Sequence, residues 1–209
     1  GFVGVSEASA GETELWFGFD GDIKIRFRFS DRLRADAADT VAALRALGLG
    51  VEVLSGDLAE PVRRAADAAG IRIFRASLSP EEKAKAVEAL AAQGRKVLMV
   101  GDGLNDAAAL AKAHAAMAPG TALEASQNAA DLVFSGDGLG AVSLSIEVAR
   151  AARRRALENF GFSALYNLIA APAAMLGLVN PFVAALAMSG SSLVVTLNAL
   201  RMTRAGGPR

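Results

Sequence analysis

Cysteine is absent from this sequence of 209 residues, and histidine occurs once, at His114. Without cysteine the chain forms no disulfide and offers no thiolate to a metal ion, so a site for a soft metal would have to recruit that sulfur from elsewhere. We interpret His114 as structural, because no second nitrogen or sulfur ligand lies near it in the sequence. Basic and acidic residues number 22 each, so net charge gives no reason to expect a nucleic-acid partner.

Charged residues are also nearly missing from residues 157–200, where Glu158 is the one exception, although arginines precede and follow this stretch. Residues 157–179 and 181–200 are each long enough to cross a hydrocarbon core about 30 Å thick. Asn180-Pro181 supplies a tight turn between them. We therefore expect a two-helix transmembrane hairpin in the lipid bilayer, with both ends in the cytoplasm because arginines flank both. Two buried helices in a soluble core are the alternative.

The rest of the chain alternates between strand-like and helix-like segments. Residues 12–19 and 23–29 read as two strands joined by the turn signal Asp20-Gly21. Beyond Asp31 the pattern predicts strands at 51–54, 71–74, 96–100, 115–118 and 132–134, and helices that end at Gly48, cover 58–69 and 80–92, and begin near Asn105 and Ala141. Such alternation implies parallel strands with right-handed crossovers. The predicted fold is therefore α/β, a Rossmann-like parallel sheet with flanking helices, followed by the transmembrane hairpin.

The string Ser79-Pro80-Glu81-Glu82 is a strong start signal for the helix at 80–92. Serine caps the helix, proline suits its first position, and a glutamate follows three residues after the serine. We interpret Glu81 and Glu82 as capping residues and not as catalysts.

An acidic, glycine-rich turn follows the apolar strand at 96–100, in the string VLMVGDGLND of residues 97–106. Ligands of open parallel sheets bind at this end of the strands. Asp102 and Asp106 can supply the oxygen ligands that Mg²⁺ prefers, and Gly101 and Gly103 allow the backbone to approach closely.

Two further groups suit a phosphoryl group. Ser55 ends the neighbouring strand in the string Ser55-Gly56-Asp57, and its hydroxyl can hydrogen-bond a phosphoryl oxygen. Lys83, in the first turn of its helix, can neutralise charge on a phosphoryl group in transfer, although a lone lysine is more often a solvated surface residue.

In this order, Ser55-Gly56-Asp57, residues 80–83 and GDGLND resemble the later motifs of haloacid-dehalogenase-type phosphotransferases, and the full GDGLND string resembles the P-type ATPases among them. The resemblance implies that Ser55 and Lys83 hold the phosphoryl group, that Asp102 binds Mg²⁺, and that Asn105 and Asp106 order that site. ATP would be the substrate. Ser55 stands where most relatives have threonine, and the hydroxyl survives this change.

The hairpin narrows the resemblance to copper-transporting ATPases of the heavy-metal class. Tyr166-Asn167 in its first helix, and Met188 and Ser192 in its second, are similar to motifs of these pumps and imply ligands for transported Cu⁺. A thioether is a soft ligand that suits Cu⁺, and Met188 and Ser192 share one helical face. The stretch 114–134 is similar to the branch that supplies copper for haem-copper oxidase assembly.

The resemblance implies a C-terminal fragment of a longer pump. Residues 1–30 would end a nucleotide-binding domain, 31–148 would form most of a phosphorylation domain without its nucleophile strand, and 149–209 would form the membrane hairpin and a tail. The family's phosphorylated aspartate and an earlier cysteine pair would lie in the missing N-terminal part, so we expect the fragment alone to be inactive. The resemblance also implies a bacterial plasma membrane and a copper chaperone as partner.

Two other functions are compatible with the sequence. In the first, the chain is a membrane-anchored phosphatase of the same superfamily that uses Asp20 and Asp22 as nucleophile and acid. The hairpin signal around these residues argues against it. In the second, the chain is a non-enzymatic membrane scaffold.

Overall fold

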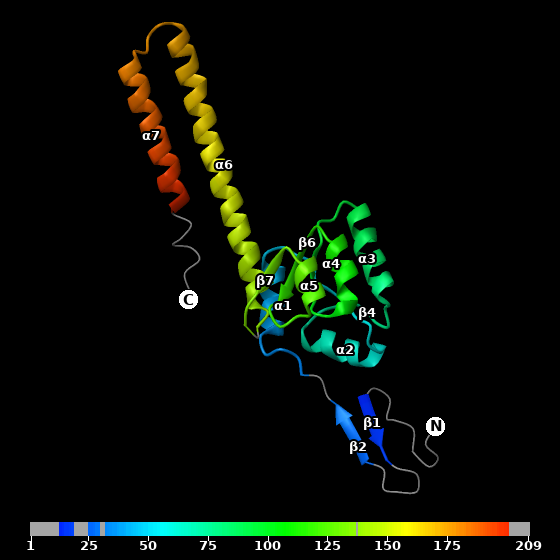
Figure 1. The fold of residues 1–209 in the computed structure, drawn as a ribbon. Coiled ribbons are helices and arrows are strands. Elements are labelled where there is room, and N and C mark those ends of the chain that lie inside the picture. The colour runs from blue at the N-terminus through cyan, green and yellow to red at the C-terminus, as the bar shows by residue number, and fades with distance from the viewer. Residues whose placement is uncertain (1–12, 19–24, 30–31, 137, 201–209) are drawn as a thin grey trace. The chain divides into compact units, whose positions relative to one another are not determined.

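The computed structural model describes residues 13–18, 25–29, 32–136 and 138–200 (Figure 1). The chain divides into two compact units, residues 1–143 and 144–209. The boundary between them falls in the first turn of helix α6 (Gly140–Met175). The domain limits that we predict at residues 30 and 148 stay predictions.

Strands β1 (Thr13–Phe17) and β2 (Ile25–Phe29) pair antiparallel, with Thr13 opposite Phe29 and Phe17 opposite Ile25. Both strands lie within the residues predicted for them, 12–19 and 23–29. The predicted turn at Asp20-Gly21 lies outside the described residues.

The first α/β part of the fold contains helix α1 (Ala37–Ala46), strand β3 (Glu52–Leu54), helix α2 (Ala59–Ala68) and strand β4 (Ile73–Arg75). β3 and β4 pair in parallel. Gly48 terminates α1 as predicted: it follows the C-cap residue Leu47, and its φ of 79° is the left-handed conformation that a residue without Cβ adopts at low cost. Apolar side chains of α1 and α2 pack with both strands around a core of Val41, Ala66, Ala69 and Ile71.

The second part contains helix α3 (Pro80–Ala92), strand β5 (Leu98–Val100), the 3₁₀ turn η1 (Leu104–Asp106), helix α4 (Ala107–Lys112), strand β6 (Ala115–Pro119), helix α5 (Glu124–Ala129) and strand β7 (Leu132–Phe134). The three strands form a parallel sheet in the order β5-β6-β7. Helices α3, α4 and α5 flank this sheet (Figure 1), over a core that includes Leu110, Met117 and Val87. The helix α5 is absent from our prediction.

The predicted parallel α/β fold is therefore present, as two short sheets. Within the described residues, β3 pairs only with β4, and β5 pairs only with β6. Each of these strands thus has one edge without a ladder partner in the part of the chain that the structure describes. Backbone N–H and C=O groups on such an edge are available to another strand.

The second unit consists of most of α6 and of α7 (Pro181–Leu200). The helix α6 ends at Met175, before the predicted Val179, because Gly177 adopts a φ of 71° and the N–H of Leu178 donates to the carbonyl of Ala173. At the start of α7 the N–H of Val183 donates to Asn180 Oδ1, 2.8 Å away. Among the described residues, α7 is the one helix long and apolar enough to cross a membrane by length and composition.

Candidate functional site

The carboxyl ends of β5, β6 and β7 border a small cavity of about 160 Å³. The last residue of each strand lines it, as do the loop after β5 and two residues from elsewhere in the first unit; the lining residues are Arg34, Val100, Gly101, Asp102, Pro119, Phe134 and Leu139. Asp102 is exposed at this edge of the sheet. The cavity thus lies at the carboxyl ends of the strands, the edge at which parallel sheets bind ligands and at which the sequence predicts the site.

Lys83 and Asp106 form an ion pair close to Gly101, one of the residues that line the cavity. Lys83 Nζ lies 2.7 Å from Asp106 Oδ1, and the two side chains are 10% and 14% exposed. The contact joins the first turn of α3 to the loop after β5. The common expectation of a solvated lysine is thus not met here, because the ammonium group is withdrawn from water and lies beside a carboxylate.

Gly101 allows the acidic loop to fold tightly against itself. A Cβ at this position would lie 2.8 Å from Asp106 Cβ and 3.0 Å from Asp106 Oδ2, closer than Cβ atoms approach such neighbours in practice. Asp106 Oδ2 accepts the N–H of Gly103 at 3.4 Å, and the N–H of Asp106 donates to the carbonyl of Gly103 at 2.9 Å. The missing side chain at residue 101 therefore makes room for the carboxylate of Asp106.

Ser126, a residue outside the predicted site, hydrogen-bonds the same loop. Ser126 is fully buried, and its Oγ donates to the carbonyl of Gly103 at 2.6 Å. The N–H of Leu123, at the start of α5, donates to the carbonyl of Asp102 at 3.3 Å. Because α5 is short and carries no motif, no spacing in the sequence indicates this contact.

Ser55, Gly56 and Asp57 form a turn of their own after β3. Ser55 Oγ donates to Asp57 Oδ2, and the N–H of Asp57 donates to Ser55 Oγ, both at 3.1 Å. The N–H of Leu78 donates to the carbonyl of Ser55 at 3.0 Å, which ties the turn to the residues just before α3. Leu78 lies two residues before α3, the helix that carries Lys83 in its first turn.

The start of α3 has the predicted capping box. Ser79 Oγ accepts the N–H of Glu82 at 3.2 Å, and the N–H of Ser79 donates to Glu82 Oε2 at 2.8 Å. Hydrogen bonds from the backbone N–H and the side chain of Ser79 stabilise the ionised carboxylate, and they lower the pKa of Glu82 below its ordinary value of 4.5. The interpretation of Glu82 as a cap fits this geometry.

The donor set at the strand ends suits Mg²⁺. This ion keeps several waters and binds one or two carboxylates together with substrate phosphates. Asp102 is exposed, and Asp106, on the same loop, is held by Lys83 and Gly103. Among the described residues no group of three or more acidic, histidine or cysteine side chains surrounds a common point, so further ligands would come from phosphate, water or another segment. The side chain of Asn105 is exposed on the same loop.

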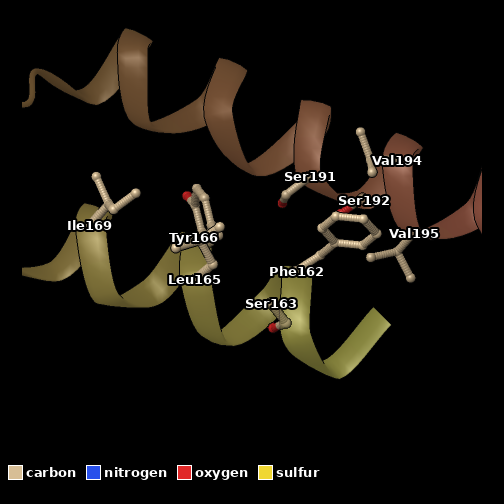
Figure 2. A pocket seen from close by; sticks show the side chains of 9 residues that line it. All are labelled: Phe162, Ser163, Leu165, Tyr166, Ile169, Ser191, Ser192, Val194 and Val195. Carbon is tan, nitrogen blue, oxygen red and sulfur yellow. The ribbon is translucent and has the colours of Figure 1, made fainter. Parts of the chain in front are cut away.

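A second pocket, of about 470 Å³, lies within the second unit between α6 and α7. Figure 2 shows Phe162 and Tyr166 directed from α6 toward α7, and Ser191 directed toward α6. Two of the four predicted cargo ligands, Tyr166 and Ser192, line this pocket. The other two, Asn167 and Met188, do not. Met188 is 67% exposed, so the described hairpin does not gather the four predicted residues around one point.

A parallel α/β fold with an acidic, glycine-rich loop at the strand ends and a lysine paired to that loop is typical of the class of proteins that bind or transfer phosphoryl groups. Residues 4–114 match the haloacid dehalogenase-like hydrolase family. The chain belongs to this family.

Comparison with individual proteins narrows the family further. The nitrogen fixation protein FixI of Rhizobium meliloti is 44% identical over 97% of this chain and 27% of its own length. A probable copper-exporting P-type ATPase V of Mycobacterium tuberculosis is 38% identical over 97% of this chain and 26% of its own length. The chain thus spans about a quarter of the length of these relatives, and its homologues include copper-exporting P-type ATPases.

Solved structures agree with this relationship. The crystal structure of a zinc-transporting PIB-type ATPase in the E2.Pi state is 33% identical, with a TM-score of 0.81 over 93% of this chain and 32% of that one. A catalytic-domain structure of the CPx-ATPase CopB-B is 30% identical, with a TM-score of 0.53 over 65% of this chain and 57% of that one.

Proposed function

We propose that this chain is the C-terminal part of an ATP-driven heavy-metal transporter that works through an aspartyl-phosphate intermediate and carries Cu⁺. The observation that carries this proposal is the ion pair of Lys83 and Asp106, in which Asp106 shares the loop after β5 with the exposed Asp102. A cation and two carboxylates at this location suit a phosphoryl group and its magnesium ion, which a solvated surface lysine would not.

Each residue of the site has a role in this proposal. Asp102 binds Mg²⁺, which neutralises phosphate charge when it is bound. Lys83 supplies positive charge to the phosphoryl group, and Asp106 holds the ammonium in place. Asn105 orders the same loop. The Ser55 hydroxyl donates to a phosphoryl oxygen in place of Asp57 Oδ2, its present acceptor, while Gly56 leaves room for the ligand.

The nucleophile would come from the missing N-terminal part of the pump. β3 and β5 each have an edge without a ladder partner among the described residues, and such edges accept one more parallel strand. We place the phosphorylated aspartate at the end of that strand. The 209 residues alone are then inactive.

The hairpin is the membrane part of the proposed pump. α7 has the length and composition of a span, and α6 supplies the second crossing over the residues that follow its arginines. Arginines at both ends favour a cytoplasmic location for both, in a bacterial plasma membrane. Tyr166 and Ser192 already line one pocket; Asn167 and Met188 would complete the Cu⁺ site with ligands from other membrane helices. A copper chaperone would deliver the ion.

The test is phosphorylation of the full-length protein by radiolabelled ATP. We expect an acid-stable phosphoenzyme that needs Mg²⁺ and Cu⁺, that is lost in Lys83→Ala and Asp102→Asn, and that Zn²⁺ supports poorly. Phosphorylation is measured with Zn²⁺ as well because one similar structure is that of a zinc-transporting ATPase. A Zn²⁺-dependent phosphoenzyme would overturn the cargo assignment, and an acid-stable phosphate on the 209-residue chain alone would overturn its inactivity.

The pairing of β1 with β2 argues against the phosphatase alternative. Among the described residues, the strand that precedes Asp20 pairs antiparallel with β2 and with neither parallel sheet, whereas a nucleophile of this superfamily would follow a parallel strand. Asp20 and Asp22 themselves lie outside the described residues. Hydrolysis of a small phosphate ester that Asp20→Asn abolishes would restore this alternative, and absence of Mg²⁺-dependent phosphate binding would favour the scaffold.

A further inference from the structure

A polar contact joins α6 and α7 at the end of the hairpin near their arginines. Asn198 is 8% exposed and is the one buried residue of α7. Its Nδ2 donates to Asn159 Oδ1 at 2.8 Å and to Glu158 Oε2 at 3.3 Å. Glu158 Oε2 also accepts Arg155 at 2.7 Å. We call these four residues, Arg155, Glu158, Asn159 and Asn198, the interhelix clamp.

Apolar packing alone sets the register of two membrane helices weakly. Lipid tails are as apolar as leucine, so helices in lipid gain little from apolar contact with one another in any particular register. A buried amide differs, because its hydrogen bonds have fixed partners and an unsatisfied amide in an apolar environment is costly. A slip of one helical turn, about 5.4 Å, would remove Asn198 from both of its acceptors. The clamp therefore favours one register.

The clamp lies on the same helical stripes as the pocket. On α6, Asn159 is followed by Phe162, Tyr166 and Ile169 at helical spacing, and these three line the pocket (Figure 2). On α7, Asn198 follows Val195 and Ser191 at the same spacing, and both line it too. Residues three and four apart share one face of a helix. The register that Asn198 fixes is thus the register of the two pocket walls.

We propose that Asn198 is a positioning residue that holds α6 and α7 in one register through Glu158 and Asn159, and so fixes which residues of α7 face Tyr166. The register does not depend on the identity of the cargo. Its consequence for Cu⁺, a weaker cargo site when the clamp is broken, rests on the proposed function.

The register can be read by disulfide cross-linking of the 209-residue chain in lipid vesicles, because the sequence has no cysteine of its own. Phe162→Cys with Val195→Cys reports the observed register, since both side chains line the pocket. Phe162→Cys with Ala199→Cys reports a slip by about one turn. Asn198→Leu should slow the first cross-link about three- to tenfold, the range that loss of an interhelical hydrogen bond in lipid implies, and should speed the second.

Two variants make the test specific. Asn198→Asp combined with Glu158→Gln exchanges the acid and the amide and should restore the first cross-link. Thr196→Val is the matched control, because Thr196 Oγ1 donates within α7, to the carbonyl of Ser192, and should leave both rates unchanged. An unchanged first cross-link in Asn198→Leu, or no recovery in the exchanged pair, would overturn the proposal.

The consequence for transport is measured separately in the full-length protein. Asn198→Leu should raise the Cu⁺ concentration for half-maximal phosphorylation without a change in the KM for ATP, and the exchanged pair should reverse the effect. If the unsubstituted protein shows no Cu⁺ dependence, the proposed function fails while the register result stands. If the register shifts and the Cu⁺ dependence does not, the clamp has no role in the cargo site.

Discussion

Lys83 Nζ lies 2.7 Å from Asp106 Oδ1, and this pair joins α3 to the loop after β5 across a distance of 23 residues in the sequence. Both side chains are largely buried. When one partner of such a pair is removed, the other is left as an uncompensated charge, whereas removal of both is much better tolerated. The pair therefore affects stability as well as the proposed phosphoryl chemistry.

Lys83→Met should destabilise the chain by about 2–3 kcal/mol, because Asp106 would keep its charge without a partner. Lys83→Met combined with Asp106→Leu should cost less than the two single substitutions together, since the pair is coupled. Thermal denaturation of the four proteins in a double-mutant cycle measures this coupling. Strictly additive effects would show that the contact contributes nothing to stability.

Gly101→Ala should displace the carboxylate of Asp106, because the new Cβ would lie 2.8 Å from Asp106 Cβ. We expect lower thermal stability and weaker binding of Mn²⁺, a paramagnetic substitute for Mg²⁺ that can be followed by electron paramagnetic resonance. Gly50→Ala is the control, since a Cβ there meets no atom within 4 Å. Equal effects of the two substitutions would contradict the close approach.

Ser126→Ala should destabilise the chain by about 1–2 kcal/mol, because the carbonyl of Gly103 would lose the hydrogen bond that it accepts from this buried hydroxyl. It should also raise the Mg²⁺ concentration that the full-length protein needs for half-maximal phosphorylation, since the loop of Asp102 would be held less firmly. Ser143→Ala removes a hydroxyl that also donates to a backbone carbonyl, that of Gly140, at 3.0 Å but at an exposed location. This control should change neither quantity measurably.

The capping box of α3 predicts a pH effect. The pKa of Glu82 is lowered in the folded chain, so its ionised form stabilises the fold fully above the unfolded value near 4.5. That contribution is lost as the pH falls below 4.5 and through the lowered pKa. Glu82→Gln should therefore reduce the difference in unfolding temperature between pH 6 and about pH 3. Glu81→Gln, in the same turn, is the comparison, and an equal reduction there would argue against the cap.

The helix α3 shows how far local signals predict the fold. Ser79, Pro80 and Glu82 define its start chemically, and both of its bounds agree with the prediction. Helix ends at glycines in the left-handed conformation are harder to predict from sequence. Gly48 terminates α1 where predicted, but Gly177 terminates α6 earlier than the apolar run suggests. The apolar run continues past Gly177 to Val179, because apolar composition reports suitability for lipid and not the backbone conformation that ends a helix.

Contacts between distant residues were the part that local patterns did not predict. The helix α5 is too short for apolar periodicity, and Ser126 therefore has no sequence signal even though its hydroxyl holds the carbonyl of Gly103. Lys83 was expected near phosphate, but its burial against Asp106 follows from packing of α3 against α4, which the sequence does not encode locally. The pairing of Asn198 with Glu158 depends in the same way on how two helices meet.

The unpartnered strand edges of β3 and β5 also bear on how this polypeptide behaves in the laboratory. When the polypeptide is produced without the segment that we propose to cover these edges, each edge can pair with the same edge of a second copy. The resulting dimers or aggregates would have no counterpart in the cell. Low concentrations, or a synthetic peptide that supplies the absent strand, should keep the polypeptide monodisperse during purification.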